Sequence, residues 1–269
     1  MNAKPVRMHI QPRFFLYILF FLPFSVMAQD TTLYKHEYYI DKKDTMPYRV
    51  LLPVDYNPSI KYPLILFLHG SGERGKDNES QLIHGGEFFL RDSIRNQYKA
   101  IVVFPQCSRN SYWSNVNIIS DTIQKTRFFN FQEDGEPTKA MTLLLGLIKQ
   151  LSKEYRLDES RLYVGGLSMG GMGTFELVRR KPKLFAAAFA ICGGANASSA
   201  SEMKNTAWWI FHGLKDNVVD PVHSKIMAAA LKAAGAEVRL TLYPDANHNS
   251  WDSALAEKEL LPWLFSHHK

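Results

Sequence analysis

The sequence predicts an α/β fold, in which a mostly parallel β-sheet is covered by helices on both faces. Three observations carry this prediction. Short, continuous apolar runs such as residues 64–68 suit strands that are buried on both sides. These runs alternate with segments whose apolar residues recur at helical spacing, an order typical of a parallel sheet. The stretch 162–178 also passes from a buried strand through a glycine-rich corner directly into a helix.

The expected strands begin with an N-terminal hairpin. Its strands are residues 33–40 and 48–52, joined by the polar turn 41–44. The later strands are each followed within two residues by glycine or proline, as expected for strands that end at a turn. They are residues 64–68, 100–104, 162–164, 184–191, 207–211 and 237–243.

The expected helices lie between these strands. They cover residues 81–91, 138–155, a segment directly after Ser168, residues 220–234 and residues 253–265. Pro137 stands at the start of the second helix, and Pro262 must be tolerated inside the last. Asp220 before Pro221 is typical of an N-cap, and Gly235 is typical of a helix end.

Two segments carry few regular signals. Residues 196–205 are small and polar and are expected to form a loop. Residues 106–137 form a long connection, and such connections are usually functional or disordered. The aromatic residues within it argue against disorder. We find no internal repeat and no sign of a second domain.

The N-terminus has the three-part plan of a secretory signal peptide. Lys4, Arg7 and Arg13 give a basic start, residues 14–27 are apolar, and Ala28 stands at the expected cleavage site. We therefore expect residues 1–28 to be removed and residues 29–269 to form one catalytic domain, secreted or periplasmic, with no stable membrane span. An uncleaved membrane anchor is the alternative.

The charge balance gives no indication of nucleic-acid binding. The formal net charge of +6 falls to +3 without residues 1–28, because that segment holds three of the 32 basic residues and no acidic one. The rest of the chain has no polybasic cluster. Cys107 and Cys192 follow predicted strands that are expected to be separated by two others, so we expect two free, buried thiols rather than a disulfide.

Ser168 is the expected nucleophile. It lies in Gly166-Leu-Ser-Met-Gly170, between the predicted strand and helix, and such a corner strains the serine and exposes its hydroxyl. The glycines on either side fit because a Cβ would crowd the strand against the helix. An ordinary glycine-rich turn is the alternative, although the context on both sides favours a nucleophile.

A serine nucleophile needs a base, and the base needs an acid to hold it. Both should lie in loops that follow later strands. Among the acids, Asp216 is preferred, while Asp220 has a structural role as a helix cap and Asp245 lies close to the histidine in sequence. His248, between the last strand and the last helix, is the expected base.

The transition state also needs donors for its oxyanion. We expect these to be the backbone N–H groups of Met169, directly after the nucleophile, and of Ser71, in the glycine-rich loop after residues 64–68. His69 is interpreted as a structural histidine that braces this loop. Trp113, Gln106 and Trp251 are candidate substrate contacts, with core packing as the alternative for the aromatic residues. No metal-binding or dinucleotide-binding motif is found, and no metal or other cofactor is expected.

Five segments together resemble the α/β-hydrolase family: LHGSGERG at 68–75, FPQC at 104–107, GGLSMGGMGT at 165–174, FHGLKD at 211–216 and NHNSW at 247–251. The similarity covers residues 46–265 and extends to secreted bacterial feruloyl and acetyl-xylan esterases and to phospholipase/carboxylesterase-like proteins. It implies an eight-stranded sheet, a Ser168–Asp216–His248 triad and a cofactor-free acyl-enzyme mechanism. At position 220 this chain has aspartate where relatives tend to have proline.

The expected function is hydrolysis of a small ester or an esterified polysaccharide, with feruloyl or acetyl groups of plant polysaccharide as the first choice. Export and the aromatic residues favour this substrate. A prolyl-oligopeptidase-like peptidase, a phospholipase or carboxylesterase acting on lipids or small esters, and a non-catalytic carbohydrate-binding module are the alternatives. The sequence assigns no oligomeric state.

Overall fold

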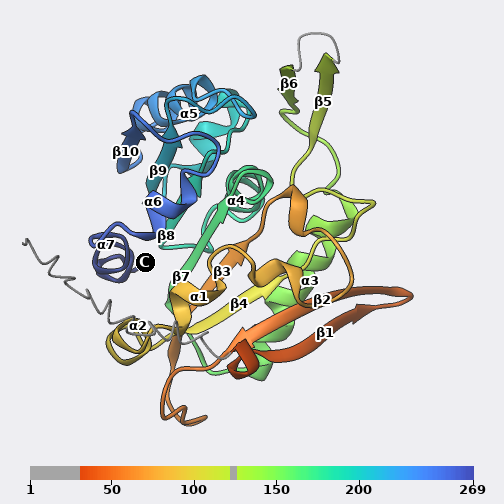
Figure 1. The fold of residues 1–269 in the computed structure, drawn as a ribbon. Coiled ribbons are helices and arrows are strands. Elements are labelled where there is room, and N and C mark those ends of the chain that lie inside the picture. Colours follow the sequence, from red (N-terminus) through yellow and green to blue (C-terminus); the bar gives the residue numbers. More distant parts are fainter. Residues whose placement is uncertain (1–30, 122–125) are drawn as a thin grey trace, which may run out of the picture.

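The computed structural model describes residues 31–121 and 126–269, so the predicted signal peptide lies outside the described residues. An eight-stranded sheet with the order β1-β2-β4-β3-β7-β8-β9-β10 forms the centre of the molecule (Figure 1). Its strands are β1 (Lys35–Asp41), β2 (Asp44–Leu51), β3 (Tyr62–Leu68), β4 (Ile101–Pro105), β7 (Leu157–Leu167), β8 (Ala187–Ile191), β9 (Ala207–Gly213) and β10 (Val238–Tyr243). The predicted α/β-hydrolase fold is confirmed.

Only the N-terminal hairpin departs from the parallel arrangement. The pairs β1–β2 and β2–β4 are antiparallel, while the pairs from β4 through β10 are parallel. Parallel neighbours end at the same edge of a sheet, so the loops after β3, β4, β7, β8, β9 and β10 meet there. The predicted reactive residues all lie in these loops or at their ends.

Helices cover both faces of the sheet, as predicted. They are α1 (Gly86–Leu90), α2 (Asp92–Gln97), α3 (Lys139–Glu154), α4 (Met169–Arg180), α5 (Val222–Ala233), α6 (Trp251–Leu255) and α7 (Leu260–Ser266). Strand β3 shows why its sequence is apolar throughout. Leu64, Leu66 and Leu68 pack in the core beneath α3, α4 and α5, whereas Ile65 and Phe67 pack in the core beneath α1, α6 and α7 (Figure 1).

Two predicted helices are each broken in the structure. The expected helix 81–91 is replaced by the 3-10 turn η3 (Ser80–Leu82), α1 and α2, because Gly85 has φ 97° and cannot continue a right-handed helix. The expected helix 253–265 is divided into α6 and α7. Pro262 has no N–H to donate, so it fits the first turn of a new helix at Leu260 but not the middle of a longer one.

Residues 106–137 contain a hairpin that the sequence reasoning missed. Strands β5 (Val116–Asp121) and β6 (Thr126–Phe131) pair antiparallel as a separate two-stranded sheet, which extends away from the main sheet (Figure 1). The expected loop 196–205 is mostly the 3-10 helix η4 (Ala197–Met203). None of the helices in the described part of the chain is long and apolar enough to cross a membrane.

Candidate active site

Ser168 lies at the corner between β7 and α4. Its backbone has φ 53° and ψ −118°, in the positive-φ region that non-glycine residues seldom adopt. The two flanking glycines permit this corner. A Cβ at Gly166 would meet the carbonyl of Gly170, and a Cβ at Gly170 would meet the carbonyl of Leu68. The chain can therefore turn sharply enough to place the serine over the edge of the sheet.

The structure brings Ser168, His248 and Asp216 together in one hydrogen-bonded chain. His248 Nε2 is 3.0 Å from Ser168 Oγ, and His248 Nδ1 is 2.8 Å from Asp216 Oδ2. The carboxylate can only accept, so Nδ1 carries the proton and Nε2 is left to accept the hydroxyl proton of the serine. This arrangement can activate a serine hydroxyl as a nucleophile.

Asp216 is held by more donors than the catalytic histidine alone. Its side chain is fully buried, and Oδ1 accepts from the amides of Val218 and Val219 at 2.8 and 3.0 Å. Burial by itself raises the pKa of Asp216. Hydrogen bonds from His212, His248 and the two amides outweigh that effect and hold the pKa well below its usual value. The acid therefore stays ionised beside His248.

His212 is a second imidazole at this carboxylate, and the sequence reasoning passed over it. Its ring is fully buried, with Nε2 3.2 Å from Asp216 Oδ2 and 2.9 Å from the carbonyl of Val219. Both neighbours accept only, so Nε2 must carry a proton. Nδ1 lies 2.7 Å from Ser224 Oγ on α5. The sequence offered one indication of this role, the His212-Gly213 pair that ends β9 four residues before Asp216.

The two competing acids have other partners. Asp220 is exposed and accepts from the amide of Val222 at 2.8 Å, the structural role considered for it from the sequence. Asp245 is also exposed and pairs with Lys215 Nζ at 2.6 Å. Among the three candidates, Asp216 is the one that contacts His248.

His69 braces the loop after β3. Its Nε2 accepts from the amide of Cys107 at 3.0 Å, so Nδ1 carries the proton and donates to the carbonyl of Gly70 at 2.6 Å. Burial lowers the pKa of His69 to about 4, which keeps the ring neutral. In a trans peptide the N–H points opposite to the carbonyl, so fixing the Gly70 carbonyl turns the Ser71 N–H away from His69. Ser71 and Met169, the first residue of α4, remain the proposed oxyanion donors.

The three candidate substrate contacts differ in exposure. Gln106 is buried and binds the side chain of Asp77 and the amide of Asn78, both at 2.9 Å. Trp113 is fully buried and donates to the carbonyl of His69 at 3.2 Å. Both therefore brace loops and offer no surface to a substrate in this structure. Trp251 is partly exposed, and its ring centroid is 5.4 Å from that of His248.

The thiols are free and buried, as predicted. Within the described residues, potential metal ligands on Cys192, Asp216 and His248 lie within 4.8 Å of one another. The acid and the imidazole already bind each other, and burial raises the pKa of the Cys192 thiol, so the thiolate that a metal requires is disfavoured. We assign this cluster to the serine site.

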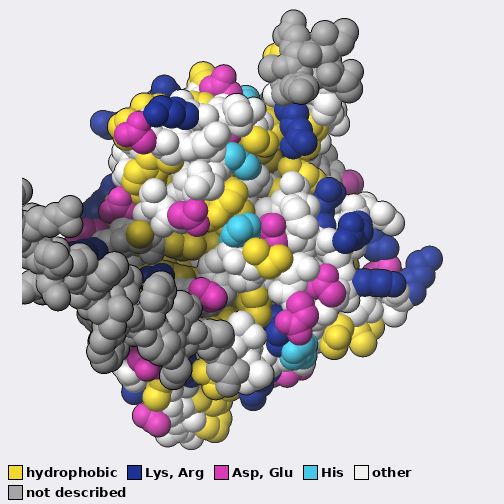
Figure 2. All heavy atoms as spheres, viewed as in Figure 1, with side chains coloured by type: hydrophobic (Ala, Val, Ile, Leu, Met, Phe, Trp, Pro, Cys, Tyr) yellow, Lys and Arg dark blue, Asp and Glu magenta, His cyan; other side chains and the backbone are white. Residues whose placement is uncertain are grey.

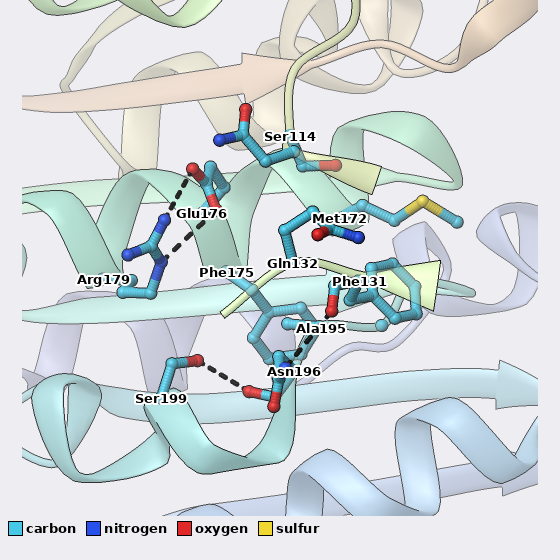
Figure 3. Close-up of a pocket in the computed structure, with 12 residues that line it drawn as sticks. Ser114, Phe131, Gln132, Met172, Phe175, Glu176, Arg179, Ala195, Asn196 and Ser199 are labelled. Carbon is cyan, nitrogen blue, oxygen red and sulfur yellow. Dashed lines mark hydrogen bonds and ion pairs between the residues drawn. The ribbon is translucent and has the colours of Figure 1, made fainter. Parts of the chain in front are cut away.

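A narrow pocket lies next to α4 and contains none of the triad residues (Figure 3). Met172, one turn along the helix from Ser168, lines it beside Phe131 of the hairpin. Some of its polar groups pair across it, since Arg179 donates to Glu176 at 2.9 Å and Asn196 donates to the carbonyl of Phe131 at 3.2 Å. This pocket therefore lies between the β5–β6 hairpin and α4, the helix that follows Ser168.

This sheet order, with a serine after β7, an acid after β9 and a histidine after β10, defines an α/β-hydrolase. Residues 57–259 match the family described as Phospholipase/Carboxylesterase, and the chain belongs to that family.

Relatives in this family are named for ester hydrolysis. A probable feruloyl esterase C from Aspergillus oryzae is 26% identical over 182 residues, which are 67% of this chain and 58% of that protein. A bifunctional acetylxylan esterase/xylanase from Neocallimastix patriciarum is 35% identical over 88 residues, 32% of this chain and 13% of that protein. The chain thus spans less than two thirds of the length of either relative.

Solved structures give the same fold. A thermostable esterase superposes with a TM-score of 0.78 at 33% identity, covering 89% of this chain and 64% of the other. A ferulic acid esterase superposes with a TM-score of 0.64 at 19% identity, covering 86% and 96%. At that identity the second likeness concerns the fold alone.

Proposed function

We propose that this protein is a serine carboxylic-ester hydrolase that acts through an acyl-enzyme on feruloyl or acetyl esters of plant polysaccharide. The hydrogen-bonded chain from Ser168 Oγ through His248 to Asp216 carries the proposal. It requires no cofactor. The family and the names of the relatives support the reaction class.

The reaction has two halves. Ser168 Oγ attacks the ester carbonyl while His248 Nε2 takes the hydroxyl proton, and the amides of Ser71 and Met169 bind the oxyanion. His248 then gives the proton to the alcohol oxygen as the ester C–O bond breaks, leaving an acyl-serine. Water attacks the acyl carbon, again losing a proton to His248. Ser168 regains that proton as the acid leaves.

The surroundings of the triad support a substrate with an aromatic or sugar portion. A groove of about 480 Å³ lies between β6 and the loop that carries Asp216. Phe128 and Phe129 line one side, and the other side is lined by Asn217, Val218, Asp220, Val222 and His223. Flat aromatic side chains suit both phenolic acids and sugar rings.

The test is hydrolysis of methyl ferulate, acetylated xylan and short nitrophenyl esters by purified protein, with the Ser168→Ala variant as control. We expect turnover of at least one class, a loss of about 10⁴-fold or more in the variant, and an acyl adduct on Ser168 by mass spectrometry after acid quench. Wild-type protein without turnover on any ester, and indistinguishable from the variant, rejects the proposal.

A carboxylesterase acting on lipids or small esters is a second candidate. Lysophospholipase-like protein 1 from Mus musculus is 25% identical over 213 residues, which are 75% of this chain and 85% of that protein. Turnover of lysophospholipid or short nitrophenyl esters, without turnover of methyl ferulate or acetylated xylan, would favour this second candidate.

We further propose that residues 1–28 are removed on export and that residues 29–269 form the catalytic domain, placed in the periplasm or the medium. Mass spectrometry of protein from each compartment, expressed from the full chain, tests this. A mature N-terminus at Gln29 supports it, and intact Met1 on protein retained in the cytoplasm contradicts it.

A further inference from the structure

Glu73 has a buried carboxylate that the mechanism above does not use. It ends the 3-10 turn η2 (Ser71–Glu73), two residues after a proposed oxyanion donor, and is only 8% exposed. Its Oε2 has no hydrogen-bond partner among the residues that the structure describes. Its Oε1 lies 3.8 Å from His84 Nε2, beyond hydrogen-bond distance.

The lack of donors at Glu73 contrasts with the rest of its loop. Asp77, four residues later, accepts from the amides of Glu79 and Ser80 and from the side chain of Gln106. The neighbouring cation, Arg74, donates to the backbone carbonyls of Ser71, Arg109 and Ser111 instead of to Glu73. A buried carboxylate without donors is costly, and a ligand that brings a donor removes that cost.

The free carboxylate oxygen lies beside the nucleophile. The point that a Cβ of Gly70 would occupy is 2.9 Å from Glu73 Oε2 and 3.7 Å from Ser168 Cβ. The two side chains therefore both pack against Gly70, at a point where not even a methyl group fits. Because the terminal torsion of glutamate is broad, either carboxylate oxygen can turn away from this contact toward a ligand.

Two neighbouring side chains, Trp251 and His84, connect this carboxylate to the general acid His248. The His248 ring centroid is 5.4 Å from that of Trp251, and the Trp251 centroid is 4.8 Å from that of His84. His84 in turn approaches Glu73. Near the middle of the face in Figure 2, histidine, acidic and hydrophobic side chains lie side by side.

The side of the substrate that meets these residues follows from the proton transfer. His248 gives its proton to the alcohol oxygen of the ester, so the alcohol portion must lie on the side of His248. Trp251, His84 and Glu73 follow from His248 through successive contacts, so we infer that they meet the alcohol portion. A carboxylate is a strong acceptor for hydroxyl groups, and an indole ring offers a flat apolar surface to a sugar ring.

We propose that Glu73, His84 and Trp251 form a subsite for a hydroxyl-bearing alcohol, such as a sugar, with Glu73 accepting a hydrogen bond from one of its hydroxyls. The subsite rests on the proposed ester hydrolysis. It determines which leaving group is preferred and takes no part in the bond-breaking steps.

The test compares two esters of the same acid, methyl ferulate and a monosaccharide ester of ferulic acid. The measured quantity is the ratio of kcat/KM for the sugar ester to kcat/KM for the methyl ester. We expect Glu73→Gln to lower this ratio by about 10-fold, because a hydrogen bond to a charged acceptor is exchanged for a weaker one. Glu87→Gln, an exposed carboxylate on α1, is the matched control and should keep the ratio of the wild type.

A second measurement uses the free methyl glycoside as an inhibitor of methyl ferulate hydrolysis. Its inhibition constant should rise in Glu73→Gln and not in Glu87→Gln. An unchanged ratio in Glu73→Gln, or an equal loss on both esters with a lowered Tm, overturns the subsite and leaves the esterase proposal standing. Wild-type protein that hydrolyses neither ester overturns the subsite together with esterase activity on ferulate.

Discussion

Two carboxylates near the nucleophile are held in opposite ways. Asp216, in the loop after β9, accepts from two amides of its own loop, from His212 in β9 and from His248 after β10, so both oxygens are occupied. The loop after β3 buries Glu73 but gives its Oε2 no donor among the described residues. A carboxylate that is fully satisfied by the protein is fixed in place, which suits the acid of a triad. A carboxylate left without donors is available to a ligand.

Removing the charge of Asp216 should have the largest effect on activity. In Asp216→Asn the amide can donate to Nδ1, which favours the wrong tautomer of His248, so kcat should fall by about 10⁴-fold. Asp245→Asn is the matched control and should keep kcat within about twofold of the wild type, since Asp245 is an exposed residue whose carboxylate pairs with Lys215. Ester hydrolysis assays check this. A comparable loss of kcat in Asp220→Asn would contradict the assignment of Asp216 as the acid of the triad.

The loop after β3 should make stability depend on pH through His69. Its pKa is lowered to about 4 in the folded protein, so between the ordinary value of 6.5 and 4 the unfolded chain binds more protons. Stability should therefore fall as pH falls through this window, by about 3 kcal/mol from this residue. Denaturant unfolding of the wild type and of His69→Gln at pH 7 and pH 4.5 measures this difference in the free energy of unfolding. An equal fall in the free energy of unfolding in both proteins would show that His69 does not cause the pH dependence.

Replacing the second imidazole at Asp216 should have a smaller effect. His212→Gln leaves His248 and two amides on the carboxylate, so we expect kcat to fall by about 10-fold. One fewer donor also raises the pKa of Asp216, so this carboxylate should become protonated at a higher pH than in the wild type, which NMR titration of the carboxyl carbon measures. A fall in kcat with an unchanged Asp216 titration would mean that His212 acts only through packing.

The smallest expected effect has the opposite sign. Glu73→Gln replaces a buried charge that lacks donors, so we expect the free energy of unfolding to rise by about 1 kcal/mol. Asp216→Asn should lower it, because there the charge is well solvated by the protein. Urea unfolding of both variants gives the comparison. Destabilisation by Glu73→Gln would show that its carboxylate has a partner after all.

The fold was predictable where its cause is local. The β3 run is apolar because both of its faces are buried, and the corner at Ser168 carries its own glycines. Asp216 and His248 followed from their order in loops after strands. The structure brings these two side chains and Ser168 into one hydrogen-bonded chain.

The features that could not be predicted from the sequence depend on contacts between residues distant in sequence. Trp113 and Trp251 look alike in the sequence, but Trp113 is buried and donates to the carbonyl of His69, 44 positions away. The β5–β6 hairpin was missed because exposed Ile119 and Phe128 break the alternation expected of a strand with one buried face. Gly85 in the sequence indicated a break in the expected helix 81–91, and its φ of 97° explains that break.

One imidazole ties together two loops that belong to different strands. His69 accepts a hydrogen bond from the amide of Cys107, after β4, and donates one to the carbonyl of Gly70, after β3. An insertion or deletion near residue 107 that displaces this amide would therefore rotate the peptide bond between residues 70 and 71. Changes to residues 106–137 that are made to alter substrate selectivity should therefore also move the Ser71 N–H and change the reaction rate, although they replace no reacting atom.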